Sequence, residues 1–194
     1  AIRAADRLRT MAPDASHTTH MATHIDSACG DWRSVVASNA AAADADDRYF
    51  ARASPGSWAS VYRVHNLMVG AYGAMMAGNS REALRAAHRL ERIITPDLLL
   101  SDPSLPDLVE SHRTTLPHVL VRFGRWEEIL ALDLPEDQEL FCSTTAMIHY
   151  ARGVALSALR RLPEAQAARE DFRAATARVP ETRLNSVPSR EVDA

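Results

Sequence analysis

The chain has 194 residues, of which 46% are hydrophobic and 24% charged, a balance typical of a globular protein rather than a disordered or membrane-spanning one. Its 22 basic residues are all arginine, so a Schiff-base lysine and a phosphate-loop lysine are excluded. A net charge of −3 gives no basic surface for nucleic acid, and no apolar run is long enough to span a membrane.

Apolar residues recur at three- and four-residue spacing along almost the whole chain, and alternating β-branched runs do not occur. This periodicity predicts an all-α protein. Alanine supplies 34 residues and aromatic residues only 6%, so closely packed helices are expected. In chain order, the predicted helices span Ala1–Met11, Ala15–Cys29, Asp31–Ala53, Ser57–Ala77, Ser80–Ile94, Leu105–Leu116 with a continuation past Pro117 to Phe123, Trp126–Leu132, Gln138–Leu159 and Pro163–Val179.

Three segments lie outside these helices. Three prolines predict a loop at Pro96–Pro106, and a second loop is expected at Leu132–Asp137. The polar residues 180–194 predict a mobile C-terminal tail behind a helical-repeat domain of residues 1–179. The first residues lack the apolar core and the cleavage site of a signal peptide, which favours a cytoplasmic protein unless upstream repeats are missing from this chain.

A helix end followed by a tight turn recurs at four places, and this repetition is the strongest signal in the sequence. The joint residues are Gly30, Gly78, Gly124 and Arg160, which lie 48, 46 and 36 residues apart. A glycine just after a helix adopts the left-handed conformation without a Cβ clash, and a following Asp or Asn caps the next helix. Each joint therefore predicts an antiparallel helix pair, in repeats of irregular length.

The joints, with their G-x-W and R-x-L-P-E-A sequences, resemble the turns of tetratricopeptide repeats. More closely, HTTHMATHIDSACGDW, YRVHNLMVGAYGAMMAG, VLVRFGRWEEIL and HYARGVALSALRRLPEA resemble stretches of a group of bacterial tetratricopeptide-repeat proteins of unassigned function, over Asp14 to Ala177. The resemblance implies a right-handed α-solenoid of about four irregular repeats. That group usually has a Pro where Ala22 stands and a second His where Met68 stands, so the role of those positions is weakened here.

Five histidines share one helical face when each is counted back from the joint glycine of its repeat. His17 and His65 lie thirteen residues before a joint, His24 and His118 lie six before, and His20 lies ten before. These offsets fall within about 60° of one another on a helical wheel. In tetratricopeptide repeats, which the chain resembles, this face forms the concave inner wall, so the resemblance implies a histidine-lined groove.

The first interpretation of this groove is a binding surface for a peptide, a partner protein or a small ligand. Met68 and Tyr72 are expected beside the histidines on the same wall. An ordinary solvated wall without a ligand is the plain alternative. The candidate ligand-binding residues are His17, His20, His24, His65, Met68, Tyr72 and His118.

The second interpretation is a transition-metal site, in a metal-binding protein or a metal-dependent enzyme. Four residues apart on a helix, His20 and His24 have Cα atoms about 6 Å apart, within reach of one ion. His17 is too far along the same helix for all three to converge without strain, so a second helix must contribute, and His65 is its equivalent residue. Copper or zinc fits such ligands, and the thioether of Met68 would favour copper. The predicted metal ligands are therefore His17, His20, His24 and His65.

Other chemistry finds no support in the sequence. It contains no H-E-x-x-H, G-x-S-x-G or Gly-rich phosphate-loop motif, so no catalytic residue is assigned and a non-enzymatic protein is favoured. Cys29 and Cys142 form neither a disulfide framework nor a zinc ribbon. The acidic run Asp44–Asp47 is predicted to be a solvated outer face, and His149 a hydrogen-bonded structural residue.

Overall fold

A computed structural model describes residues 2–53 and 58–183 of the chain. These residues form helices and no strand, which confirms the all-α prediction for the described part of the chain. The helices fall into two compact units, Ala1–Ile93 and Ile94–Ala194. Within each unit, helices that follow one another in the chain pack against one another.

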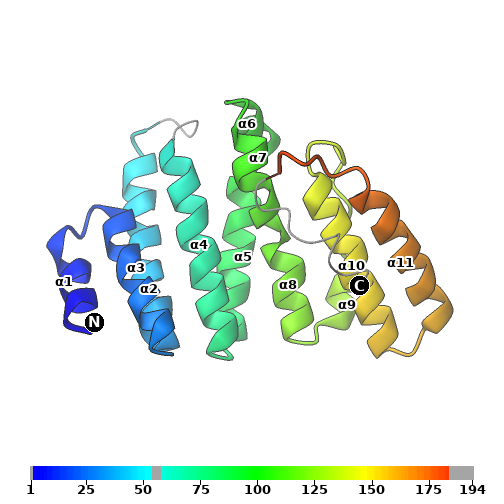
Figure 1. The fold of residues 1–194 in the computed structure, drawn as a ribbon, viewed down its shortest axis with the longest axis horizontal. Helices are drawn as coiled ribbons and strands as arrows, with labels where there is room; N and C mark the ends of the chain where they lie inside the picture. The colour runs from blue at the N-terminus through cyan, green and yellow to red at the C-terminus, as the bar shows by residue number, and fades with distance from the viewer. Residues whose placement is uncertain (1, 54–57, 184–194) are drawn as a thin grey trace. The chain divides into compact units, whose positions relative to one another are not determined.

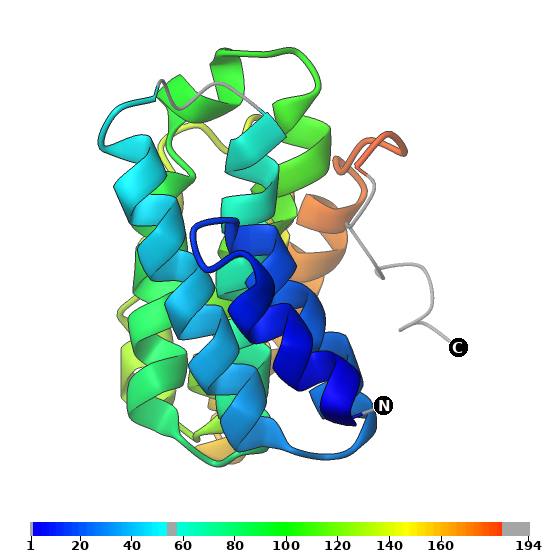
Figure 2. The same ribbon diagram turned by 90° about the vertical axis from the view of Figure 1, so that its left-hand side faces the viewer.

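The first unit contains five helices in the described residues, and each packs on the next, as Figures 1 and 2 show. The second and fourth of them also contact each other, which brings two non-consecutive helices side by side. These elements are α1 (Ile2–Met11), α2 (Ser16–Ala28), α3 (Trp32–Phe50), α4 (Trp58–Met76) and α5 (Ser80–Ile93).

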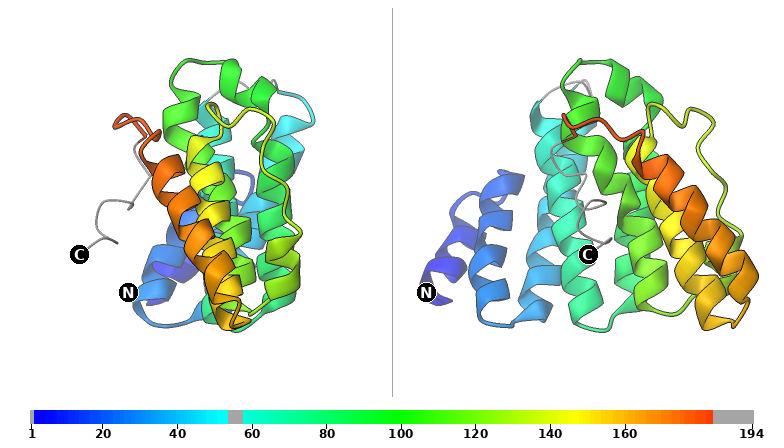
Figure 3. Two further views of the ribbon diagram at one scale, coloured as in Figure 1. Left: turned by 90° about the vertical axis from the view of Figure 1, so that its right-hand side faces the viewer. Right: turned by 45° about the vertical axis from the view of Figure 1, so that its right-hand side comes forward.

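The second unit is organised around one long helix, α10 (Cys142–Ala158), which contacts most of the other elements of the unit. Figure 3 shows α10 and the last helix, α11 (Leu162–Thr176), running side by side. The preceding elements are shorter: α6 (Pro96–Leu100), α7 (Leu105–Val109), the 3₁₀ helix η1 (Glu110–Thr114), α8 (Thr115–Arg122) and α9 (Trp126–Leu130).

All four predicted joints share one backbone geometry. The joint residue has a positive φ in each case: 75° at Gly30, 69° at Gly78, 66° at Gly124 and 59° at Arg160. At every joint, the N–H of the following residue donates to a carbonyl five residues back, over 2.8 to 2.9 Å, and the joint N–H donates to the carbonyl three residues back. These two hydrogen bonds define a Schellman motif. The repetition found in the sequence is therefore a repetition of helix ends.

The predicted loop Pro96–Pro106 is wrong, because it contains α6 and the first residues of α7. Proline is excluded from helix interiors but favoured in the first turn, where its missing N–H costs nothing. Pro96 stands at that position, and the Thr95 side chain caps the helix by accepting from Leu98 N at 3.3 Å. A proline cluster thus marks helix starts as well as loops.

Two further predicted boundaries also differ from the structure. The continuous helix expected over Leu105–Phe123 is divided by η1. Pro117 has no N–H, so it cannot donate the α-helical hydrogen bond to the residue four positions before it, which lies in η1. The helix expected from Gln138 begins at Cys142, because the Asp137 side chain accepts from Glu139 N and holds a turn there. Ala1 and Ser57, the first residues of two predicted helices, lie outside the described residues.

Small residues let the helices of the first unit approach closely. A Cβ atom added at Gly73 on α4 would overlap Cγ1 of Val35 on α3, so only glycine fits at this crossing. Alanines with no exposed surface line the same unit on all five of its described helices: Ala5, Ala22, Ala42, Ala71, Ala74, Ala83 and Ala87. The alanine content of the sequence therefore has a direct packing role.

A buried carboxylate stabilises the start of α10. Glu110 has no exposed surface, and its side chain accepts from Ser143 N at 3.3 Å, Thr144 N at 2.9 Å and Thr144 Oγ1 at 2.7 Å. A negative charge at a helix N-terminus is favourable, and the amides of the first turn have no partner within their own helix. Glu110 thus caps α10 from η1, in place of a side chain at the cap position.

The predicted tail, residues 180–194, is described only as far as Arg183. That side chain is 8% exposed, and its guanidinium donates to Leu140 O at 3.0 Å and to Cys142 Sγ at 3.4 Å. Residues 184–194, the rest of the predicted mobile tail, lie outside the described residues.

Candidate metal centre

Four of the predicted site histidines meet where α2 packs against α4. His17, His20 and His24 stand on successive turns of one face of α2, and His65 comes from α4. The ring centre of His20 lies 5.3 Å from that of His17, 5.0 Å from that of His24 and 4.6 Å from that of His65. Three- and four-residue spacing places side chains on one helix face, and the neighbouring helix supplies the fourth ring.

His20 is the buried centre of this cluster, with no exposed surface. Its Nδ1 lies 2.7 Å from Oδ1 of Asn39 on α3. The orientation of the Asn39 amide is fixed because its Nδ2 donates to Val35 O at 2.9 Å. Oδ1 can only accept a hydrogen bond, so Nδ1 of His20 carries the proton and Nε2 carries the lone pair.

The lone pair of His20 is available for a ligand. Burial is the main cause that lowers the pKa of His20 to about 4. Charge on the neighbouring His65, His24 and His17 contributes to the lowering, and the hydrogen bond with Asn39 opposes it. The ring is therefore neutral at physiological pH. Its Nε2 is buried without a hydrogen-bond partner among the described residues. A buried acceptor without a partner costs stability, which makes this nitrogen a candidate ligand atom.

Three of the four histidines have the spacing of metal ligands. Within the described residues, His20, His24 and His65 each offer one ligand atom, and these atoms all lie within 4.8 Å of one another. Nitrogen ligands at the usual bond length of a tetrahedral zinc ion lie about 3.4 Å apart, so the three rings would have to move closer together to hold one ion. His20 is buried, His65 half-buried and His24 exposed, so the site opens to solvent on the side of His24.

His17 lies beside this triad rather than within it. Its ring is stacked on that of His20 and lies 6.2 Å from that of His65. The closest aromatic neighbour of His17 is Tyr62 on α4, with 4.3 Å between ring centres. Of the four predicted ligands, His20, His24 and His65 therefore have the spacing of metal ligands, and His17 lies next to them.

The remaining predicted site residues occupy separate positions. Met68 follows His65 by one turn of α4 and is half-buried. Tyr72 is 45% exposed, and its ring meets that of Trp32 edge-on at 5.8 Å. His118 is exposed on α8, in the second unit, and is not part of the triad.

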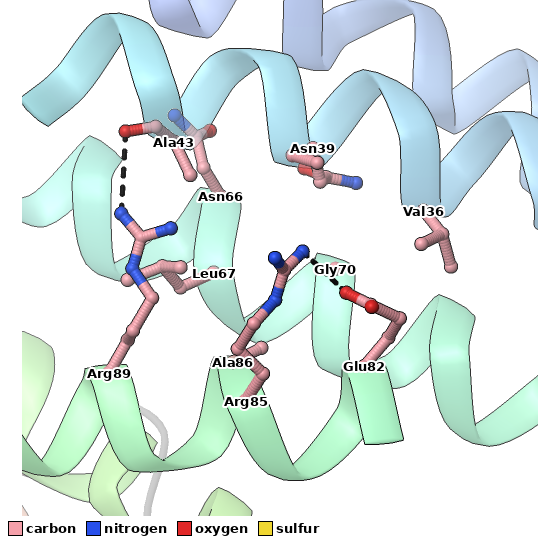
Figure 4. A pocket seen from close by; sticks show the side chains of 11 residues that line it. Val36, Asn39, Ala43, Asn66, Leu67, Gly70, Glu82, Arg85, Ala86 and Arg89 are labelled. Carbon is pink, nitrogen blue, oxygen red and sulfur yellow. Dashed lines mark hydrogen bonds and ion pairs between the residues drawn. The ribbon is translucent and has the colours of Figure 1, made fainter. Parts of the chain in front are cut away.

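The sequence analysis missed Asn39 and Tyr62. Asn39 stands in the middle of a predicted helix, and its contact with His20 depends on how α3 is rotated against α2, which sequence spacing does not give. Figure 4 shows that Asn39 also borders a narrow pocket between α3, α4 and α5, near Gly70 and Arg85. Gly70 has no side chain and so leaves room for Asn39, since a Cβ atom at position 70 would lie 3.1 Å from Cβ of Asn39.

The prediction of a solvated acidic run at Asp44–Asp47 is wrong for Asp46, which is 4% exposed. Its carboxylate accepts a hydrogen bond from Nδ2 of Asn66 at 3.0 Å. Asn66 directly follows the triad residue His65 in the sequence. Burial raises the pKa of Asp46, although hydrogen bonds from Ser16 and Asn66 oppose the shift. The helical period explains the error, because positions 44 and 47 face solvent while 46 faces α4.

The other histidines show no comparable cluster within the described part of the chain. His149 is 12% exposed and lies 3.8 Å from the Asp171 carboxylate, and burial is the main cause that lowers its pKa. His88 on α5 is exposed and lies 3.1 Å from Glu91.

Comparison with known proteins gives no further guide to this site. A scan against models of protein families finds none that matches the chain, and searches of curated proteins and of solved structures return no significant match. Among the described helices, none is both long and apolar enough to cross a membrane.

Proposed function

We propose that this protein binds one transition-metal ion, zinc or copper, through His20, His24 and His65. The observation that carries this proposal is that Nε2 of His20 is buried without a hydrogen-bond partner in the described structure, on a ring whose centre lies 5.0 Å from that of His24 and 4.6 Å from that of His65. Neutral imidazole is a good ligand for both metals, and copper(II) binds such sites more tightly than zinc.

The hydrogen bond between His20 and Asn39 supports the proposal independently. A metal-bound histidine almost always donates its second ring N–H to a carbonyl or carboxylate, which fixes the tautomer and the ring orientation. Asn39 Oδ1 accepts this hydrogen bond here at 2.7 Å. The lowered pKa of His20 favours the same state, because a ligand must be deprotonated before the ion binds.

We further propose that the helix pairs form a tetratricopeptide-like right-handed solenoid of about four irregular repeats, like the bacterial proteins that the sequence resembles. The identical Schellman geometry at the four joints supports this arrangement. On such a scaffold, the second candidate function is the binding of a peptide, a partner protein or a small ligand. Half-exposed aromatic side chains on α4, Tyr62 at 44% and Tyr72 at 45%, favour it.

Metal titration of the purified chain tests the first proposal. Zn²⁺ and Cu²⁺ are titrated separately by calorimetry after chelator treatment, into the wild type, a His20→Ala/His24→Ala variant and a His88→Ala control. We expect one tight equivalent in the wild type and the control, and its loss in the double variant. Equal, weak binding by all three proteins would exclude the metal site and leave the helical scaffold.

A further inference from the structure

The last helix pair of the second unit, α10 and α11, has an open groove along one side. Figure 3 shows the two helices side by side, and residues of both line the groove, which has a volume of about 560 Å³. Among the described helices, only α10 packs extensively against α11. The groove side of α11 therefore has no further helix packed on it in the described structure.

The floor of the groove is apolar and partly exposed. The rings of Tyr150 on α10 and Phe172 on α11 lie 5.9 Å apart, and both side chains are half-buried, as is that of Val154. Leu162, at the start of α11, lines the groove and is 65% exposed. Exposed apolar side chains that gather in one concave surface are typical of binding sites.

The first unit shows what packs at the same positions of another helix pair. The joint of α2 and α3, Gly30, has the same geometry as Arg160, the joint of α10 and α11. His20 and His24 lie ten and six residues before Gly30, and their ring centres lie 4.6 Å and 6.4 Å from that of His65 on α4. These two positions of α2 therefore lie against the next helix.

The second helix of that pair, α3, meets α4 as well. Val35 and Asn39 lie five and nine residues after the joint. A Cβ atom at Gly73 of α4 would overlap Cγ1 of Val35, and one at Gly70 would lie 3.1 Å from Cβ of Asn39. Helix α4 thus packs on the positions ten and six residues before the joint and five and nine residues after it.

The same four positions of the last pair line the groove. Counted from Arg160, they are Tyr150, Val154, Ala165 and Arg169. Joints of one geometry place equivalent positions alike, so the groove has the shape that accepts a helix. An amphipathic helix laid in an apolar groove is also a common mode of protein recognition.

The charged side chains that line the groove are basic. Arg169 and Arg173 are exposed and stand four residues apart on α11, so they share one face of the helix. Glu170 and Asp171, the acids between them in the sequence, do not line the groove. A partner that places carboxylates beside these two arginines gains charge complementarity.

We propose that the groove between α10 and α11 binds an amphipathic, acidic α-helix of a partner protein. The apolar face of that helix covers Tyr150, Val154 and Phe172, and its carboxylates lie at Arg169 and Arg173. Burial of the apolar floor supplies the affinity, while the carboxylates select the partner and its orientation. The proposal concerns the second unit and does not depend on the metal site in the first.

A second copy of this chain is a less suitable partner because of its charge. Two copies joined through the same groove would bring the arginines of one α11 close to those of the other. Helix α1 is basic as well, since it carries Arg3, Arg7 and Arg9 against Asp6 alone. The positive groove therefore favours a different, acidic protein.

Helical peptides as long as α4, 19 residues, test this binding by fluorescence anisotropy with the full chain. The probe has leucine and alanine on one face and glutamate on the other. A matched peptide has lysine in place of each glutamate, and a third peptide keeps the glutamates but carries a central proline that breaks the helix. We expect the acidic helix to bind about tenfold more tightly than either of the others. Equal affinities, or no binding of the acidic peptide, would overturn the proposal.

Charge reversal identifies the surface that the peptide uses. Arg169→Glu/Arg173→Glu should weaken binding of the acidic peptide about tenfold and strengthen binding of the lysine peptide, an exchange that a general loss of structure cannot produce. Arg3→Glu/Arg7→Glu is the matched control, because these arginines are also exposed and four residues apart, on α1. An unchanged preference in the α11 variant would place the binding elsewhere and contradict the proposal.

The apolar contact is tested at Leu162. Leu162→Ala should weaken the acidic peptide about three- to tenfold, because apolar surface that the peptide covers is lost. Leu100→Ala, which truncates a leucine that is 72% exposed on α6, is the control and should leave the affinity within twofold. Equal affinities of the two variants would exclude the groove as the apolar contact.

Two other occupants of the groove have distinct outcomes. If a second copy fills it, the wild type self-associates in sedimentation experiments and Arg169→Glu/Arg173→Glu alters that association. If residues 184–194 fill it, a chain that ends at Arg183 binds the acidic peptide more tightly than the full chain does. Either result would overturn the proposal, whereas a monomer with the same affinity in both lengths supports it.

Discussion

The side chains of His20 and Asn39 share a buried hydrogen bond of 2.7 Å that determines which ring nitrogen of His20 carries the proton. Asn39 is itself held by Val35 O, so its carbonyl oxygen has one orientation. The selection of the His20 tautomer is thus built into α3, a helix that contributes no ligand to the triad.

Replacing Asn39 should weaken metal binding without removing a ligand. In an Asn39→Ala variant, Nδ1 of His20 loses its acceptor, so the ring is free to rotate and to change tautomer. We expect the affinity for Zn²⁺ to fall about 10- to 100-fold, the usual effect of losing such a partner. Asn66→Ala is the matched control, since Asn66 is also fully buried but bonds Asp46. Equal loss of affinity in both variants would indicate a general packing effect.

Protonation of His20 should make the metal-free protein unstable in acid. Its pKa in the folded state is about 4, below the ordinary value of 6.5, so the unfolded chain takes up this proton first as the pH falls. This destabilisation is absent above pH 6.5. Near pH 4 it lowers the free energy of unfolding by about 3 kcal/mol. Urea unfolding at pH 7 and pH 4.5 should show a larger loss for the wild type than for His20→Gln. Parallel losses would contradict the shifted pKa.

The crossing of α3 and α4 should reject a single methyl group. Gly73→Ala places a Cβ against Cγ1 of Val35, and overpacking of this kind costs about 1 to 3 kcal/mol. Truncation at Val35 removes the clashing atom, so Gly73→Ala should be less destabilising in a Val35→Ala background. The interaction free energy from the double-mutant cycle, measured by urea denaturation, checks this. Strictly additive effects would show that the two residues do not meet.

The fourth joint carries a strain that the other three avoid. Arg160 has a φ of 59°. This conformation costs glycine nothing and Asn or Asp little, but it is costly for other residues. Arg160→Gly should raise the unfolding free energy by about 0.5 to 1 kcal/mol. The reverse change, Gly78→Ala, should lower it by a similar amount, because open space around Gly78 leaves backbone strain as the only cost. Melting temperatures that move in the same direction would refute a shared joint geometry.

Sequence spacing predicted that four histidines meet. His17, His20 and His24 share a face because they belong to one helix, and His65 joins them because equivalent positions before two joints lie on adjacent helices. The exclusion of His17 from the triad depends on side-chain rotamers, which spacing does not determine. The role of Asn39 depends on helix rotation in the same way.

Two of the errors in the fold, the loop expected at Pro96–Pro106 and the continuous helix expected over Leu105–Phe123, have a common cause in proline. Pro96 and Pro106 start short helices in the segment predicted as a loop, and Pro117 lies just after a 3₁₀ segment in a helix predicted to be continuous. Proline interrupts one hydrogen-bond pattern and is tolerated at the start of another, so its presence alone does not distinguish the two.

The carboxylate of Glu110 links two distant parts of the second unit, because its acceptor atoms serve amides 33 and 34 residues later in the chain. The first turn of α10 therefore cannot complete its hydrogen bonding from local sequence. The intervening segment must close on itself before that turn is stable, at an entropic cost that grows with the length of the loop. We expect α10 to form late and together with η1, so that the second unit folds in one concerted step.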